Sequence, residues 1–210
     1  MKRALDICLS MTLLALLSAP MLIIAALIWF EDRGSILFTQ ERAGLHQQPF
    51  KLLKFRSMVL NIQPEHDIGQ VHLTHPGVTG TGKIIRRLKI DELPQLINVI
   101  KGDMSLLGPR PTILSQVEQY TDTQLRRLSM RPGISGWAQV NGNTKLDWAS
   151  RIALDLWYID HWSLMMDLKI LLKTVAVVIG GEKANPIAVQ EAIIHANSTD
   201  RCSTRNSRRP

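Results

Sequence analysis

The longest apolar stretch of the chain lies near its N-terminus. Residues 7–30 contain no charged side chain, while Lys2 and Arg3 precede the stretch and Glu31 follows it. As a helix at ~1.5 Å per residue it would measure about 36 Å, enough to cross the hydrocarbon core of a bilayer. The stretch is too long for the apolar part of a signal peptide, and no small-x-small cleavage pattern ends it. The pattern therefore predicts a membrane helix.

Pro20 lies in the middle of this apolar stretch. A proline lacks the backbone N–H and clashes with the carbonyl four residues earlier, so it kinks or breaks a helix. The Ser18 hydroxyl can satisfy a backbone carbonyl at such a break. Two topologies stay open. One is a spanning helix that would export everything after Arg33, and the other is a helix-break-helix that enters one leaflet and returns to the same side of the membrane.

Shorter patterns predict a small mixed domain after the membrane segment. Apolar residues alternate as in strands around turns at Gly44 and Pro49, and later leucines and isoleucines recur at helical spacing. The predicted elements are short strands over 34–60 and helices over 91–102, 116–130 and 146–181. We therefore predict an α+β, mostly helical fold with a membrane anchor at 1–33, a compact domain at 34–181 and a polar, basic, largely disordered tail at 182–210.

The segment 146–181 is typical of an amphipathic helix at a membrane surface. Its leucine and methionine face is accompanied by Trp157 and Trp162, and tryptophan is enriched at membrane interfaces. Lys169 and Lys173 make its last apolar run too charged to span a bilayer. An ordinary core helix fits the same periodicity, so both interpretations stay open.

The composition points to anionic partners. The chain has 210 residues, and 25 Lys and Arg against 18 Asp and Glu give a formal net charge of +7. Such a surplus favours nucleic acid, acidic lipid headgroups or phosphorylated substrates. No nucleic-acid recognition motif accompanies the charge, so we expect no nucleic acid among the partners. Cys8 and Cys202 lie near opposite ends of the chain and indicate neither a disulfide framework nor a metal site.

Two weak motifs occur between residues 61 and 83. The stretch TGTGK, residues 79–83, has neither the spacing of a phosphate-binding P-loop nor a GxGxxG pattern. His72 and His75 have no evident third metal ligand in the sequence. We expect neither motif to form a site by itself.

An acidic pair, Asp91 and Glu92, stands out in this basic chain within the stretch KIDELPQL. Pro94 fits the first turn of a helix, where carboxylates just before it are favoured by the helix dipole. That purely structural role stays open. Basic residues nearby, and Arg110 held between two prolines, favour a second interpretation, which is Mg²⁺-assisted phosphoryl transfer.

Six ordered stretches carry a family signature. They are KRALD, FTQERAG, PFKLLKFRSM, DELPQLINVIKGDMSLLGPRP, RPGISGWAQVNG and WSLMMDLKILLKT. Together they lie between residues 2 and 174 and resemble the bacterial sugar transferase family, the monotopic polyprenyl-phosphate phosphoglycosyl transferases in their minimal form. The resemblance covers about residues 2–181. The resemblance implies transfer of sugar 1-phosphate from a UDP-sugar to undecaprenyl phosphate, which yields undecaprenyl-diphosphate-sugar and UMP at the first membrane step of a surface glycan pathway.

The same resemblance implies a role for each candidate site residue. Asp91 would be the nucleophile that forms a covalent phospho-sugar intermediate. Glu92, together with Asp91, would bind Mg²⁺, which is the implied cofactor. Lys54, Arg86 and Arg110 would bind phosphate.

The resemblance also implies where the chain lies. The membrane helix would break at Ser18 and Pro20, so that the chain re-enters one leaflet and the catalytic domain stays on the cytoplasmic face of the bacterial inner membrane. Inner-membrane lipids would be partners, and a homodimer stays open. Three positions differ from the common family pattern and bear on the donor sugar or the site: Lys89, Asn143 and Ala149.

Two other functions stay open on the residues alone. A membrane-anchored Mg²⁺-dependent phosphatase, acting on nucleotide sugars or polyprenyl phosphates, would use the same carboxylates with water as acceptor. A non-catalytic scaffold would use only the basic surface. The sequence also leaves open whether Asp155 and Asp160 join the site or form ion pairs elsewhere.

Overall fold

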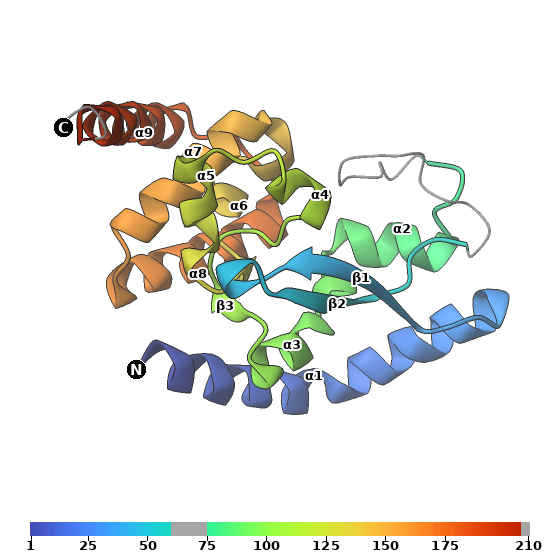
Figure 1. Ribbon diagram of the computed structural model, residues 1–210. Helices are drawn as coiled ribbons and strands as arrows, with labels where there is room; N and C mark the ends of the chain where they lie inside the picture. The colour runs from blue at the N-terminus through green and yellow to red at the C-terminus, as the bar shows by residue number, and fades with distance from the viewer. Residues whose placement is uncertain (60–74, 207–210) are drawn as a thin grey trace. The chain divides into compact units, whose positions relative to one another are not determined.

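The computed structural model describes residues 1–59 and 75–206, and these form two compact units. Unit 1 consists of Met1–Arg42 and Phe50–Met104, and unit 2 consists of Ala43–Pro49 and Ser105–Pro210. Helices dominate both units and short strands accompany them (Figure 1). The predicted α+β, mostly helical fold is confirmed at this level.

The apolar stretch forms one helix, α1 (Lys2–Asp32). Within the described part of the chain, it is the helix long and apolar enough to cross a membrane. The predicted interruption at Ser18 and Pro20 is wrong, because Pro20 lies inside a continuous helix that curves along its length (Figure 1). Proline removes only the hydrogen bond to Leu16, and the helical bonds on either side persist. The Ser18 hydroxyl donates instead to the Ala15 carbonyl at 2.8 Å.

Unit 1 continues with a hairpin and three short helical elements. The hairpin consists of β1 (Leu37–Ala43), the 3-10 turn η1 (Leu45–Gln47) and β2 (Pro49–Phe55), and its tip, residues 43–49, belongs to unit 2. The helical elements are α2 (Gly80–Arg87), the 3-10 turn η2 (Ile90–Glu92) and α3 (Gln95–Lys101). The strands and the helix from Asp91 onward follow the prediction. Gly102 ends α3 with a φ of 102°, which glycine adopts without strain.

The apolar helix α1 shares a core with the rest of unit 1. Ile28 of α1 is buried with Phe55 of β2 and Ile85 of α2. At the other end of α1, Arg3 donates to two carbonyls at the C-terminal end of α3. One is that of Ile100 in the last turn, at 3.1 Å, and the other is that of Met104 just after the helix, at 3.3 Å. Residues 1–33 are therefore part of unit 1, and the predicted boundary at 33 does not divide the compact units.

Unit 2 is built around a short parallel strand pair. Strands β3 (Ser105–Leu107) and β4 (Gly133–Ser135) pair with Ser105 opposite Gly133 and Leu107 opposite Ser135. The helical elements are α4 (Leu114–Val117), α5 (Asp122–Leu125), η3 (Arg126–Ser129), α6 (Trp137–Val140), η4 (Asn143–Lys145), α7 (Trp148–Asp160) and α8 (Leu164–Gly180). Its core includes Leu154, Tyr158 and Ile170, which are all fully buried.

The single helix predicted over 116–130 is wrong. The chain forms α4, α5 and η3 instead, because Thr121 starts a new helix. Its hydroxyl accepts a hydrogen bond from the Gln124 N–H, and the Gln124 side chain accepts from the Thr121 N–H. This capping box interrupts the apolar spacing on which the prediction relied. The helical segment predicted over 146–181 is confirmed, and it forms two helices, α7 and α8.

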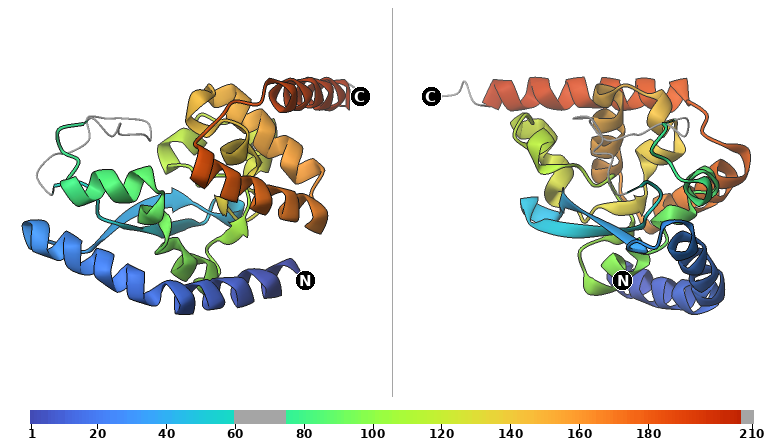
Figure 2. Two further views of the ribbon diagram at one scale, coloured as in Figure 1. Left: turned by 180° about the vertical axis from the view of Figure 1, so that it is seen from behind. Right: turned by 90° about the vertical axis from the view of Figure 1, so that its right-hand side faces the viewer.

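The predicted disordered tail is also wrong for most of its length. Residues 186–206 form the helix α9 (Pro186–Asn206), which lies against α7 in unit 2 (Figure 2). Ala188 and Ala192 of α9 are buried in the core that α7 and α8 share. Small residues four apart give a polar helix a narrow packing stripe, which the net polarity of the segment conceals.

Candidate active site

The acidic pair, Asp91 and Glu92, lies in η2, immediately before α3. Pro94 occupies the position before the first residue of α3, as its fixed φ and missing N–H predict. Glu92 forms an ion pair with Lys54: its Oε1 lies 2.9 Å from Lys54 Nζ, and both side chains are about one-fifth exposed. The acidic pair is thus partly withdrawn from solvent and faces a lysine.

Asp91 has a perturbed environment. Burial raises the pKa of its carboxyl above the ordinary value, and the charge of Glu92 raises this pKa further. The charges of Lys54 and Arg86 act in the opposite direction on the same pKa. These four predicted residues are therefore close enough to interact, and two cations surround two carboxylates. Perturbed carboxylates in such a cluster are typical of functional sites.

Asn98 fixes the strand that carries Lys54. Its side chain is buried in α3, where Nδ2 donates to the Lys51 carbonyl at 2.8 Å and to Asp103 Oδ2 at 3.1 Å. Its Oδ1 accepts from the Leu53 N–H at 3.0 Å. Asn98 thus bonds the backbone of β2 directly before Lys54, which holds that lysine beside the acidic pair.

We expect Asn98→Ala to destabilise the protein by about 1–3 kcal/mol, because it removes the hydrogen bonds of a buried amide to the Leu53 N–H and the Lys51 carbonyl of β2. At this chain length the midpoint of thermal unfolding should fall by roughly 2–4 °C per kcal/mol. Asn197→Ala, on the exposed face of α9, is the matched control and should leave the midpoint nearly unchanged. Equal midpoints for the two variants would contradict this role of Asn98.

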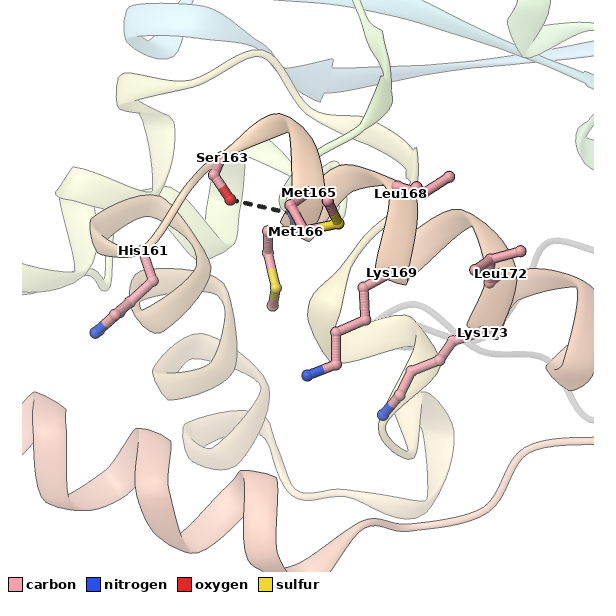
Figure 3. Close-up of a pocket in the computed structure, with 8 residues that line it drawn as sticks. All are labelled: His161, Ser163, Met165, Met166, Leu168, Lys169, Leu172 and Lys173. Carbon is pink, nitrogen blue, oxygen red and sulfur yellow. Dashed lines mark hydrogen bonds between the residues drawn. The ribbon is translucent and has the colours of Figure 1, made fainter.

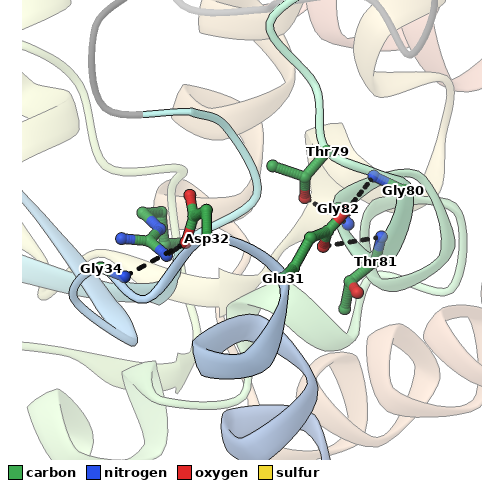
Figure 4. Close-up of polar contacts among 8 residues, drawn as sticks. Glu31, Asp32, Gly34, Thr79, Gly80, Thr81 and Gly82 are labelled. Atoms are coloured by element: carbon green, nitrogen blue, oxygen red, sulfur yellow. Dashed lines mark hydrogen bonds and ion pairs between the residues drawn. The ribbon is translucent and has the colours of Figure 1, made fainter.

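The N-terminus of α2 is already occupied by an anion from the chain itself. Glu31, at the end of α1, accepts hydrogen bonds from the N–H groups of Gly80 at 2.7 Å and Thr81 at 3.2 Å (Figure 4). Thr79 caps the same helix, since its hydroxyl accepts from the Gly82 N–H at 2.9 Å. The glycine-rich TGTGK turn is therefore a helix start clamped to the membrane helix.

This clamp positions the basic side of the site. Arg86 lies in the last turn of α2, close enough to Asp91 to affect its pKa. Next to Glu31, Asp32 forms an ion pair with the buried Arg56, which follows β2. The C-terminal end of α1 is thereby bonded both to the helix that carries Arg86 and to the residue that follows the strand carrying Lys54.

Arg110, the fifth predicted site residue, belongs to unit 2, where it follows β3. Its carbonyl accepts a hydrogen bond from Arg127 Nη2 at 2.9 Å. Burial lowers the pKa of Arg151, and the positive charge of Arg110 lowers it further. Arg110 therefore stands in a region of concentrated positive charge, which suits a phosphate group.

A buried ion pair supports this part of unit 2. Arg127 Nε lies 2.6 Å from Asp155 Oδ2, and the two side chains are 3% and 0% exposed. Arg127 Nη1 also donates to the Tyr120 hydroxyl at 2.6 Å. Burial raises the pKa of the Asp155 carboxyl, and Arg127 opposes that rise. Asp155 is thus an internal ion-pair partner, and Asp160 pairs with the partly exposed Arg126.

The acidic pair fits a magnesium ion. Mg²⁺ is commonly held by one or two carboxylates together with phosphate oxygens of the substrate, and a cation relieves the burial of Asp91 beside Glu92. The described residues contain no cluster of three or more His, Cys, Asp or Glu that could hold a metal by itself. His75 accepts from the Gly77 N–H at 3.0 Å, and His72 lies outside the described residues.

Sequence reasoning missed three supporting residues: Asn98, Glu31 and Arg127. Asn98 left a trace in the sequence, since it is an amide between the apolar residues Ile97 and Val99 of α3. Glu31 and Arg127 look like ordinary flanking charges, and their partners are 49 and 28 residues away in sequence. Only the fold brings such partners together.

Comparison with known proteins gives a consistent result. The family profile described as bacterial sugar transferase matches residues 1–181. The protein named "Uncharacterized sugar transferase EpsL" from Bacillus subtilis (strain 168) is 43% identical, over 87% of this chain and 89% of EpsL. The UDP-glucose:undecaprenyl-phosphate glucose-1-phosphate transferase of Caulobacter vibrioides is 44% identical, over 83% of this chain and 68% of that enzyme.

A third relative is longer. The undecaprenyl-phosphate galactose phosphotransferase of Salmonella typhimurium is 36% identical over 85% of this chain, which spans 40% of that enzyme. The family match includes both the acidic pair and the apolar helix α1. With nearly nine-tenths of the chain inside the family profile, this protein is a member of the bacterial sugar transferase family.

Proposed function

We propose that this protein transfers sugar 1-phosphate from a UDP-sugar to undecaprenyl phosphate, through a covalent intermediate on Asp91. The observation that carries the proposal is the cluster of Asp91, Glu92, Lys54 and Arg86 in a chain of this family. Relatives are named as undecaprenyl-phosphate transferases of glucose 1-phosphate and galactose phosphate. A surface glycan pathway is the setting that the names of exopolysaccharide relatives support.

The reaction takes two displacements at one phosphorus atom. An Asp91 carboxylate oxygen attacks the sugar-bearing phosphorus of the donor, and the bond between the two donor phosphates breaks to release UMP. A phosphate oxygen of undecaprenyl phosphate then attacks the same phosphorus and displaces Asp91. The second step forms undecaprenyl-diphosphate-sugar and regenerates the carboxylate, so atoms and charges balance without an added reactant.

Each residue of the site has a role suited to this chemistry. Asp91 and Glu92 would hold Mg²⁺, which neutralises phosphate oxygens when bound. Lys54 and Arg86 would bind donor phosphate and keep Asp91 ionised, and Arg110 would bind phosphate through its guanidinium fork. The partly buried position of the acidic pair limits access of water, which would otherwise compete with the lipid acceptor.

The membrane topology follows from the substrates. Nucleotide sugars are made in the cytosol, so we propose that α1, as one continuous curved helix (Figure 1), enters and leaves the cytoplasmic leaflet of the inner membrane. The contacts of both ends of α1 with unit 1 support this arrangement, since Arg3 and Glu31 each bond the same compact unit. A straight spanning helix would place these two residues on opposite sides of the bilayer.

The test is UMP release by the purified protein in detergent, with Mg²⁺ and a panel of UDP-sugars, with and without undecaprenyl phosphate. Multiple turnover that needs the lipid would support the transferase and would also name the sugar. Continuous release without lipid would show the alternative, a Mg²⁺-dependent phosphatase. No release with any donor would contradict both enzymatic functions.

Turnover should also fall at acidic pH in a way set by Asp91. The nucleophile must be ionised, and burial raises the pKa of Asp91 in the metal-free site, so at subsaturating Mg²⁺ the acid limb of kcat/KM should lie above the 3.8 of an ordinary aspartate. Lys54→Met removes a positive charge that holds this pKa down, so the limb should move to higher pH. The check is a pH–rate profile of both proteins with a saturating lipid acceptor. Superimposable acid limbs would contradict the coupling of Lys54 to Asp91.

A further inference from the structure

A groove on the surface of unit 2 runs along α8 and has a volume of about 530 Å³. Figure 3 shows its lining, which comes from α8 and from the turn before it. Met165, Leu168 and Leu172 line it with hydrocarbon, and Lys169 and Lys173 line it with positive charge. The groove is thus complementary to an anionic lipid, which has a hydrocarbon chain and a negatively charged headgroup.

The apolar part has no cover from the described protein. Met165, Leu168 and Leu172 are 72%, 48% and 65% exposed, and they follow one another at helical spacing. Met166, which also lines the groove, and Ile170 are buried and belong to the core of unit 2. An exposed strip of three large apolar side chains beside a packed core face indicates a ligand or membrane contact.

The cationic part is held in place. Both ammonium groups lie over the ring of Trp137, at 5.2 Å for Lys169 and 4.7 Å for Lys173. Lys173 Nζ also donates to Asn141 Oδ1 at 3.0 Å. Burial lowers the pKa of Lys173, and the like charge of Lys169 lowers it further, so an anion placed between them would relieve a repulsion.

We propose that this groove binds the lipid acceptor, with Lys169 and Lys173 on the phosphate and the strip of Met165, Leu168 and Leu172 along the first isoprenoid units. The proposal rests on the proposed function, because it takes the acceptor to be a polyprenyl phosphate. Lysines that only contact bilayer headgroups need no fixed position and extend freely into the interface. A pair held over one indole ring instead presents two donors at a defined place, as a specific phosphate site requires.

The first experiment measures kinetics in mixed micelles. Lys169→Gln/Lys173→Gln should raise the KM for undecaprenyl phosphate at least about tenfold, since each charge-assisted hydrogen bond to phosphate is lost. The KM for the UDP-sugar and the stoichiometric burst of UMP without lipid should stay unchanged. Lys183→Gln, an exposed lysine just after α8, makes the same charge change outside the groove and should behave like the wild type.

A second pair of variants tests the hydrocarbon part. Leu172→Gln lies in the groove and Ile179→Gln lies outside it on the same helix, and both side chains are largely exposed. Only Leu172→Gln should raise the KM for the lipid, by about fivefold, while the melting temperatures of both variants stay close to that of the wild type. An equal rise in both would indicate general membrane contact and would overturn the proposal.

Direct binding separates this proposal from the proposed function. Farnesyl phosphate, titrated calorimetrically into the detergent-solubilised protein without donor, should bind the wild type and lose at least about tenfold in affinity in Lys169→Gln/Lys173→Gln. Farnesol, which has the chain without the phosphate, should not distinguish the two proteins. This result can stand even if no UDP-sugar is turned over. Unchanged affinity for farnesyl phosphate, or weaker binding to anionic vesicles with an unchanged lipid KM, would overturn the groove as the acceptor site.

Discussion

Asp91→Asn is expected to lower multiple-turnover UMP release by at least about a thousandfold, because the covalent step has no nucleophile. The stoichiometric burst of UMP expected without lipid should vanish with it, whereas the loss of a mere helix cap would preserve both. Asn has nearly the shape of Asp, so UDP-sugar binding should persist. Substantial turnover in this variant would exclude Asp91 as the nucleophile, and rapid-quench measurement of the burst decides the question.

The same variant should melt at a higher temperature than the wild type at neutral pH. Burial raises the folded-state pKa of Asp91 above its unfolded value. The folded protein therefore loses stability as pH rises from the unfolded-state pKa through the folded-state pKa. Asn cannot ionise and avoids this loss, and its advantage should shrink as pH falls. Asp147→Asn is the contrasting control, because hydrogen bonds from Ser150 lower the pKa of Asp147 and its ionised form stabilises the fold. That variant should gain no stability at neutral pH.

Arg127→Met is expected to destabilise unit 2 by about 3–5 kcal/mol, because it leaves the fully buried Asp155 carboxylate without its partner. At roughly 2–4 °C per kcal/mol, the unfolding midpoint should fall by about 6–20 °C. Arg126→Met removes a neighbouring arginine whose partner, Asp160, is partly exposed, and should cost less than about 1 kcal/mol. Thermal unfolding of the two variants in the same detergent gives the comparison.

A double variant distinguishes charge burial from packing. Arg127→Met/Asp155→Leu replaces both members of the pair with apolar side chains, so no charge remains buried, and much of the lost stability should return. A double variant as unstable as Arg127→Met would show that Arg127 acts through its bonds to Tyr120 and to the Arg110 carbonyl. In that case UDP-sugar binding should fall together with stability.

The sequence predicted features that depend on short-range patterns. The uncharged run of α1, the strands around Gly44 and the helix that starts after Pro94 each follow from residues within one element. The acidic pair was recognisable for the same reason, since its two carboxylates are adjacent. Lys54 and Arg86 were named from the family resemblance, and their proximity to the pair is a property of the fold.

Features that depend on distant partners could not be predicted. The helix α9 was missed because its contribution to the core comes from two alanines, whose burial depends on α7. Asp155 could not be assigned from sequence, because burial and a partner 28 residues away decide its role. The continuity of α1 through Pro20 shows that a proline can remove one hydrogen bond of a long helix without breaking the helix.

The hairpin tip at residues 43–49 has a consequence for the order of folding during synthesis. It belongs to unit 2, although the strands on both sides of it belong to unit 1. Ala43 is fully buried, bridges to Thr112 and packs with Val117 and Leu128. A ribosome completes unit 1 at Met104, before any of these three partners exists. The tip can therefore be buried only after these partners have been synthesised. Until then, the nascent chain carries residues 43–49 without the partners that cover them in unit 2.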